Sequence, residues 1–291
     1  MQSARGFEYG VRHIISPQSG LLCDVLLGIL DIDRTQIEFL LQLGCIYVKG
    51  QREIQNIFIE KEDYLRVHTK PRRFLADDGL WKTRIVFQNS DFVVVKKISG
   101  LPVHASVDNL KENVQAYVEK AIGQKVLLTH RLDVPTRGLI VYAKTEQFQS
   151  AFNKLLIERG MNKIYRALVH GEKIPLGLVT HYMEPSPRAP KTVSTEAKTD
   201  WQECQLEVLN YRLWEPGISE VRIKLITGRT HQIRAQMSAL GYPIVGDVSY
   251  GAARQWLEDR IELEAAELSF TNPLSGEIHH FRADEDNYLI D

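Results

Sequence analysis

Polar groups crowd the segment Thr129-His130-Arg131-Leu132-Asp133-Val134-Pro135-Thr136-Arg137-Gly138-Leu139, which leads into an apolar run. Pro135 and Gly138 predict a turn just before that strand. Working side chains are often placed in turns and at strand ends. Arg131 and Asp133 lie two residues apart, so in an extended segment their side chains point the same way. By spacing alone, the carboxylate is a nucleophile, a general base or one half of an ion pair.

A second polar segment, Thr227-Gly228-Arg229-Thr230-His231-Gln232-Ile233-Arg234, follows a predicted strand and opens a predicted helix. That helix is expected to end at Gly241, with Pro243 just beyond it. Backbone N–H groups at a helix start, together with Arg229, form a good anion site. From spacing alone, each segment is as readily a structural ion-pair cluster as a catalytic one.

Short β-branched runs separated by helical stretches predict an α+β fold for the larger part of the chain. They alternate with helices too unevenly for a doubly wound parallel fold. We therefore expect a mixed, mostly antiparallel sheet with flanking helices. The expected strands are 92–96, 139–143, 164–169 and 221–226, and the expected helices are 110–122, 146–158 and 230–240. Residues 185–191 carry three prolines, which predicts an extended basic loop.

The N-terminal residues predict a small α/β domain of their own. Apolar positions between 21 and 43 recur at helical spacing with a break at 31–35, which indicates two short helices. Gly44 ends the second helix, and β-branched and aromatic residues then predict strands at 46–48, 57–59 and 64–68. We expect a module with its linker over residues 1–75 and a second domain over residues 80–291.

Composition places the chain among ordinary globular proteins. Apolar residues make up 44% and charged residues 25% of the 291 residues, which argues against disorder and against a disulfide-stapled miniprotein. No apolar run approaches the roughly 18–20 residues that span a bilayer, and the first eight residues lack the apolar core of a secretory signal. Three cysteines lie far apart and offer no disulfide framework. We therefore expect a soluble protein in a reducing cytoplasm.

Charge is distributed unevenly around a net value of −1. Residues 80–175 carry a net +7 and residues 254–291 a net −7, so a groove for a polyanion is compatible with the neutral total. The acidic stretch 258–267 is expected to be the solvated face of a helix. His130 and Asp133 lack a third metal ligand at a convincing spacing, and no Gly-rich phosphate-binding loop follows a strand. We expect neither a metal nor a cofactor.

Several ordered motifs together resemble the RluA-type family of RNA pseudouridine synthases. Residues 130–139 are similar to the family's catalytic-aspartate motif, residues 163–171 to its tyrosine motif and residues 227–234 to its third motif. Residues 95–104 and 241–251 match the segments around them. The resemblance covers about residues 80–282 and implies that family's catalytic fold. Arg137, Ile98 and Gln236 stand where the family usually has Ser, Pro and often His.

The N-terminal residues in turn resemble the alpha-L RNA-binding module, found first in a small-subunit ribosomal protein. The resemblance rests on residues 37–41, 44–50 and 63–67. Its first helix carries Cys23-Asp24 where the module usually has Arg or Lys.

The family resemblance implies a role for each catalytic residue. Asp133 is the catalytic carboxylate, and Arg229 pairs with it and keeps it ionised, because a nearby opposite charge favours the charged form. Tyr165 lies against the uracil and relays the proton of C5. Arg131 fills the stack that the extruded uridine leaves. The expected RNA-binding residues are Arg131, His130, Thr136, Arg137, Lys96, Lys97, Arg188, His231 and Arg234. Of these, Lys96, Lys97 and Arg188 are expected from their charge and position to bind phosphates.

The sequence thus predicts a monomeric RNA pseudouridine synthase that acts on uridines of ribosomal or transfer RNA without metal, cofactor or membrane. Two alternatives stay open. One is a non-catalytic RNA-binding or ribosome-assembly factor on the same fold. The other is an RNA N-glycosidase that releases the base.

Overall fold

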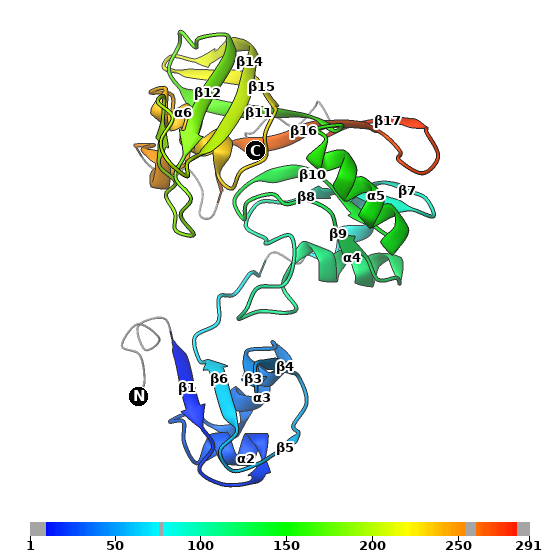
Figure 1. The fold of residues 1–291 in the computed structure, drawn as a ribbon, viewed down its shortest axis with the longest axis vertical. Coiled ribbons are helices and arrows are strands. Elements are labelled where there is room, and N and C mark those ends of the chain that lie inside the picture. The colour runs from blue at the N-terminus through cyan, green and yellow to red at the C-terminus, as the bar shows by residue number, and fades with distance from the viewer. Residues whose placement is uncertain (1–9, 76–77, 254–259, 284–291) are drawn as a thin grey trace. The chain divides into compact units, whose positions relative to one another are not determined.

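The computed structural model, which describes residues 10–75, 78–253 and 260–283, divides into two units (Figure 1). The first unit comprises Met1–Asp77 and His104–Tyr117, and the second comprises Asp78–Val103 and Val118–Asp291. Residues 104–117, which the sequence places in the second domain, therefore pack with the N-terminal unit.

The first unit is built on a four-stranded antiparallel sheet of order β1-β6-β3-β4, with two short helices against one face. Asp33 caps the second helix, and its carboxylate accepts the backbone N–H of Gln36. Buried aliphatic side chains such as Leu26, Ile46 and Leu65 form the core. The elements are β1 (Val11–Ile15), β2 (Gly20–Leu21), α2 (Leu22–Leu27), α3 (Arg34–Gln42), β3 (Ile46–Val48), β4 (Gln51–Glu53), β5 (Phe58–Ile59) and β6 (Tyr64–His68).

Residues 104–117, called here the inserted segment, are held to the rest of the first unit by polar contacts. The guanidinium of Arg72 donates two hydrogen bonds to the buried carboxylate of Asp108, at 3.0 and 2.8 Å. The backbone N–H of Leu110 donates to the carbonyl of Leu43 at 2.7 Å. Residues 104–117 are therefore an integral part of this unit.

The second unit contains an eleven-stranded sheet whose central path runs β13-β12-β14-β15-β11-β16-β10-β8-β7. Among the strand pairs of the described residues, only β10 with β16 is parallel. The prediction of a mixed, mostly antiparallel sheet is confirmed. The strands are β7 (Ile85–Gln88), β8 (Phe92–Lys97), β9 (Leu127–Leu128), β10 (Arg137–Ala143), β11 (Asn162–His170), β12 (Gly177–Met183), β13 (Val193–Ser194), β14 (Gln202–Glu215), β15 (Ile218–Leu225), β16 (Leu263–Thr271) and β17 (Ile278–Arg282).

Helix α5 covers the sheet beside β10 and closes an aromatic core (Figure 1). Phe148 stacks on Phe92 with ring centroids 5.0 Å apart, and Phe152 meets Phe270 edge to face at 4.9 Å. Thr145 caps the helix by accepting the N–H of Phe148. Helix α5 spans Glu146–Ile157. The other helices after the first seventy-five residues are η1 (Trp81–Arg84), α4 (Val114–Ile122), α6 (Gln232–Ala239) and η2 (Val248–Tyr250).

Two expectations about helices are corrected. The helix expected from residue 110 begins at Val114, because Asn113 turns its carboxamide to the backbone N–H of Ala116. The acidic stretch is not a helix face: residues 263–267 belong to β16, and Glu262 and Glu264 are buried. Residues 258 and 259 lie outside the described residues.

In the ranges that the structure describes, no helix is both long enough and apolar enough to cross a membrane.

Candidate active site

A cavity of about 370 Å³ in the second unit gathers side chains from three distant segments of the chain. The turn before β10, the strand β11 and the start of α6 all contribute to its wall. Eight predicted site residues line it: His130, Arg131, Asp133, Thr136, Tyr165, Arg229, His231 and Arg234. Four others do not line it: Lys96, Lys97, Arg137 and Arg188.

The turn that carries Asp133 is closed by its own backbone and by glycine. The N–H of Thr136 donates to the carbonyl of Asp133 at 3.1 Å. Gly138 follows with φ of 111°, and a Cβ there would lie 2.4 Å from the carbonyl oxygen of Ala265 on β16. Only glycine permits this approach of β10 to β16. The chain after the turn is thereby held in the parallel pair at the centre of the sheet.

Lys97 supports this turn from inside the protein. Its ammonium donates to the carbonyls of Ile98, Val134 and Thr136 at 3.0, 2.9 and 2.6 Å, and the residue is 1% exposed. Burial lowers its pKa to about 7, and the nearby Asp133 carboxylate opposes that shift. The prediction that Lys97 binds phosphate is wrong, because all three of its N–H donors are directed at backbone carbonyls.

The cation beside Asp133 is Arg234, in the first turn of α6. Nη1 of Arg234 lies 3.6 Å from Oδ2 of Asp133, while the same guanidinium binds the buried Asp247 through two bonds of 2.7 and 2.8 Å. No ion pair joins Arg229 to Asp133, although the structure describes both residues, and the Arg229 side chain is exposed at the cavity wall. The predicted pairing is therefore wrong. Arg234, expected to bind RNA, takes that place because it is already anchored by Asp247.

His231 approaches Asp133 from the other side. Nε2 of His231 lies 3.9 Å from Oδ1 of Asp133, and its Nδ1 is 3.0 Å from the hydroxyl of Tyr250. The residue caps α6 with φ of 59° in the left-handed region. Burial lowers the pKa of His231, and Asp133 opposes this shift. The Tyr250 hydroxyl also accepts the N–H of Lys191, in the loop that carries Arg188. Sequence reasoning missed the role of Tyr250, whose only signal was its place in a matched motif.

Tyr165 of β11 forms part of the wall of the same cavity. A register shift between Ile164 and Tyr165 interrupts the pairing of β11 with β16, and such bulges redirect side chains. Burial, with the negative charge of Asp133 nearby, raises the pKa of Tyr165 far above its usual value. The phenol is therefore neutral and keeps its proton at physiological pH.

His130 is a neutral acceptor in this wall. Its Nε2 receives the backbone N–H of Val141 at 3.1 Å, which places the ring proton on Nδ1. Burial, reinforced by the Lys163 ammonium, lowers the pKa of His130 to about 3. Protonation of Nε2 would remove the hydrogen bond from the N–H of Val141. This contact therefore also favours the neutral ring and a lower pKa.

Acid should therefore destabilise the protein through His130. The unfolded chain binds a proton at this imidazole below about pH 6.5, whereas the folded protein does not. The contribution of neutral His130 to the free energy of unfolding is therefore complete above that pH and is lost as pH falls toward 3. His130→Gln keeps an acceptor for the N–H of Val141 and does not titrate. We expect urea unfolding of wild type to lose more free energy between pH 6.5 and 4 than unfolding of His130→Gln. Parallel pH profiles for the two proteins would contradict this assignment.

Arg137 belongs to a buried ion-pair cluster. Its guanidinium lies 3.0 Å from Glu262 and 3.5 Å from Glu264, and Glu264 also binds Arg166 at 2.7 Å. Both carboxylates are almost completely buried. These ion pairs, with acidic residues ahead of and within β16, fix the Arg137 guanidinium; its contact with RNA stays a prediction.

The remaining predicted contacts are placed as follows. Arg131 is exposed at the cavity, and Thr136 is buried in its wall. Arg188 is exposed on the loop between β12 and β13, as the prolines predicted. Lys96 is half-buried on β8. No group of three or more His, Cys, Asp or Glu side chains among the described residues is placed to hold a metal ion.

Comparison with known proteins now defines the class. A family model described as RNA pseudouridylate synthase matches residues 91–239. The chain belongs to this family, and its RluA-type resemblance is confirmed. The alpha-L resemblance of the N-terminal unit stays a prediction.

Individual relatives cover different shares of their own length. The chain is 34% identical to "RNA pseudouridine synthase 6, chloroplastic" of Oryza sativa subsp. japonica, over 71% of this chain and 50% of that protein. It is 31% identical to "Dual-specificity RNA pseudouridine synthase RluA" of Vibrio vulnificus, over 69% of this chain and 82% of that protein. The chain thus spans half the length of the rice relative.

A solved structure has the same architecture. "Human RNA Pseudouridylate Synthase Domain Containing 1" superposes with a TM-score of 0.56 and 27% identity, over 69% of this chain and 82% of that one. The large, mostly antiparallel sheet is therefore the pseudouridine synthase fold.

Proposed function

We propose that this protein isomerises specific uridines of ribosomal or transfer RNA to pseudouridine. The observation that carries the proposal is the Asp133 carboxylate, held by Arg234 and His231 in a cavity that Tyr165 also lines. Family membership supports the reaction, and relatives named as acting on the ribosomal large subunit and on tRNA support the substrate class.

The reaction breaks the bond from N1 of uracil to C1′ of ribose and forms a bond from C5 to C1′. N1 gains a proton and C5 loses one. Asp133 acts at the sugar, where its negative charge stabilises the electron-poor C1′. Tyr165 contacts the detached base and participates in proton transfer at C5. Arg131, exposed at the cavity, occupies the stack that the extruded uridine leaves, because a guanidinium stacks well on bases.

The remaining assignments are part of the same proposal. Arg229 and Arg188 contact phosphates, since both are exposed cations on segments bordering the site. The second unit forms the catalytic domain, and the first unit, which residues 104–117 join, forms the accessory module. The chain acts as a monomer in a reducing cytoplasm, which its three buried free cysteines favour.

Tritium release tests the reaction directly. Unmodified ribosomal and transfer RNA transcripts carrying tritium at C5 of uridine are incubated with the full chain, and water-borne tritium and liberated nucleosides are measured. Release accompanied by pseudouridine supports the proposal. Free uracil would indicate the N-glycosidase instead, and binding without either product would indicate a non-catalytic RNA-binding factor.

Tyr165→Phe should slow product formation by roughly 10²-fold or more, the usual contribution of a positioned acid or base. The ring remains, so contact with the base and the packing of β11 are retained. The measurement is the single-turnover rate at saturating RNA, with the dissociation constant determined in parallel. An unchanged rate would remove Tyr165 from the proton transfer.

A further inference from the structure

The first unit presents a row of basic and aromatic side chains across its whole sheet. Backbone pairing aligns His13 of β1 with Arg66 of β6, Arg66 with Tyr47 of β3, and Tyr47 with Arg52 of β4. Directly paired residues project from the same face of a sheet. The residues that alternate with them, including Ile14, Leu65 and Ile46, lie in the apolar core. The row therefore stands on the face away from the core, called here the open sheet face.

Side chains on this face form two stacked pairs. The Arg66 guanidinium lies over the Tyr47 ring, with Cζ 4.1 Å from its centroid. Tyr64, two residues before Arg66 on β6, stacks on His13 with centroids 5.9 Å apart and planes 24° apart, and its hydroxyl lies 2.5 Å from Nδ1 of His13. Both stacked pairs involve residues of β6 that project from the open sheet face, so rings and a cation are presented on the same face.

One half of this face is covered by the inserted segment. The Tyr47 hydroxyl donates to the carbonyl of Val107 at 2.9 Å, and Arg52 donates to the carbonyl of Ser106 at 2.6 Å. The other half, made by His13, Tyr64 and part of Arg66, is open, and Tyr64 is 38% exposed. These hydrogen bonds hold Tyr47 and Arg52 in place, and Arg66, which borders the open half, stacks on the Tyr47 ring.

Arg66 has no acidic partner among the residues that the structure describes. Within the described part of the chain, Arg66 forms no ion pair, and its Nε has no hydrogen-bond partner. The neighbouring His68, 9% exposed, likewise has an unpartnered Nε2. A guanidinium stacked on a ring and not neutralised by a carboxylate attracts an anion.

The cations on the helix side of the same unit are already neutralised. The Arg73 guanidinium lies over the Phe39 ring of α3, with Cζ 4.9 Å from its centroid, but it is paired with Glu112 at 2.6 Å. Arg34 of α3 is likewise paired with Asp24 of α2, and Glu38 adds a further negative charge to that side. The stacked cation that has no carboxylate partner among the described residues therefore lies on the open sheet face.

We propose that the open sheet face binds a single-stranded stretch of the RNA substrate, with a base stacked on the Tyr64–His13 pair and a phosphate held by Arg66. This rests on the proposed function, since it assigns a second contact to the same RNA. Bases stack on aromatic rings whatever their sequence, and single strands expose them. A duplex hides its base faces, so the open sheet face selects single strands.

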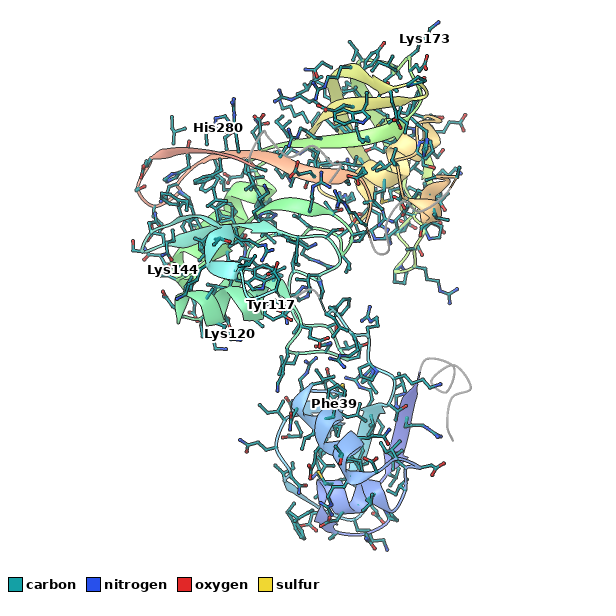
Figure 2. All side chains as sticks on the ribbon, turned by 180° about the vertical axis from the view of Figure 1, so that it is seen from behind. Phe39, Tyr117, Lys120, Lys144, Lys173 and His280 are labelled. Atoms are coloured by element: carbon teal, nitrogen blue, oxygen red, sulfur yellow. The ribbon has the colours of Figure 1, made fainter. Side chains whose placement is uncertain are left out.

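Fluorescence anisotropy with the full chain tests this surface. The probes are a labelled single-stranded RNA of mixed sequence, 12 nucleotides in length, and the same sequence as a duplex. Tyr64→Ala, His13→Ala and Arg66→Gln are compared with Phe39→Ala and Arg34→Gln. Phe39, on α3 (Figure 2), is a matched control because its exposure of 39% equals that of Tyr64 within one percent.

The three open-face variants should each weaken binding of the single strand by about tenfold, the effect of losing one base–aromatic or phosphate contact. The two controls should bind as wild type does, and duplex binding should change little. Arg66→Gln should also reduce the salt dependence by about one phosphate contact. With an RNA that the enzyme modifies, the three open-face variants should show a higher KM and an unchanged kcat.

Equal single-strand affinities for open-face and control variants would overturn the proposal and leave this surface to a protein partner. His13→Ala and Tyr64→Ala alter exposed side chains, so they answer the question even where Arg66→Gln reduces the melting temperature. The proposed function is judged separately: if the open-face variants lose RNA affinity but wild type forms no pseudouridine, only the proposed function fails.

Discussion

Asp133→Asn is expected to reduce pseudouridine formation by at least about 10³-fold, as the loss of a central catalytic group does in other enzymes. Asn has the shape of Asp without its charge, so the turn closed by Thr136 and Gly138 is retained. The side chain is 22% exposed and faces the cavity, so the substitution leaves no buried cavity behind. The reduced rate of pseudouridine formation would then result from the missing negative charge and nucleophilicity of the carboxylate.

Binding of RNA by Asp133→Asn should stay close to that of wild type. Removing a negative charge from a cavity that faces phosphates weakens no attraction. The measurements are tritium release under single-turnover conditions and the dissociation constant by anisotropy. Asp200→Asn is a matched control, because Asp200 is exposed and its φ of 64° is one that Asn also tolerates. Full activity of Asp133→Asn would show that another group performs the chemistry.

Arg234→Gln is expected to damage both stability and turnover. Arg234 is 6% exposed and Asp247 is 1% exposed, so the substitution leaves a buried carboxylate without its bidentate partner. Breaking such a pair costs about 3–5 kcal/mol in free energy of unfolding. The same change removes the cation beside Asp133, whose distance to Arg234 is 3.6 Å.

A double variant separates the two effects. Arg234→Gln with Asp247→Asn has no buried charge at this position, so part of the lost stability should return in urea unfolding. Turnover should not return, because Asp133 still lacks its cation. If the double variant recovered wild-type single-turnover rates, Arg234 would act only by anchoring Asp247 and not on the catalytic carboxylate.

Local patterns were sufficient for much of the framework. The strands β3 and β6 coincide with the stretches that β-branched and aromatic residues indicated, and α5 differs from its expected range by one residue at its end. Side-chain preferences and caps act over a few residues, so a short window contains them. Long strands that lack a clean alternation, such as β14, were not anticipated.

Because a short window of sequence contains only local preferences, it also led to the wrong predictions at the site. The segment with Asp133 and the segment with Arg229 and Arg234 were both recognised, but the choice between the two arginines was wrong. Both are cationic and close in sequence, and only the direction of α6 and the anchor at Asp247 place Arg234 against the carboxylate. Lys97 was assigned to phosphate for its charge, whereas its ammonium donates to the carbonyl of the adjacent Ile98 and to those of the distant Val134 and Thr136.

Motif order, alternation and turn residues are properties of neighbouring positions, so they were enough to predict the class of protein, the mostly antiparallel sheet and the turn that carries Asp133. Three features became visible in the folded chain alone: the cation that meets Asp133, the burial of Glu262 and Glu264 against Arg137, and the packing of residues 104–117 with the first unit. These outcomes depend on charges far apart in the chain, such as Arg137 and Glu262, which are separated by 125 positions. Burial strengthens their interactions and selects among them, and burial is a property of the folded packing and not of any short segment.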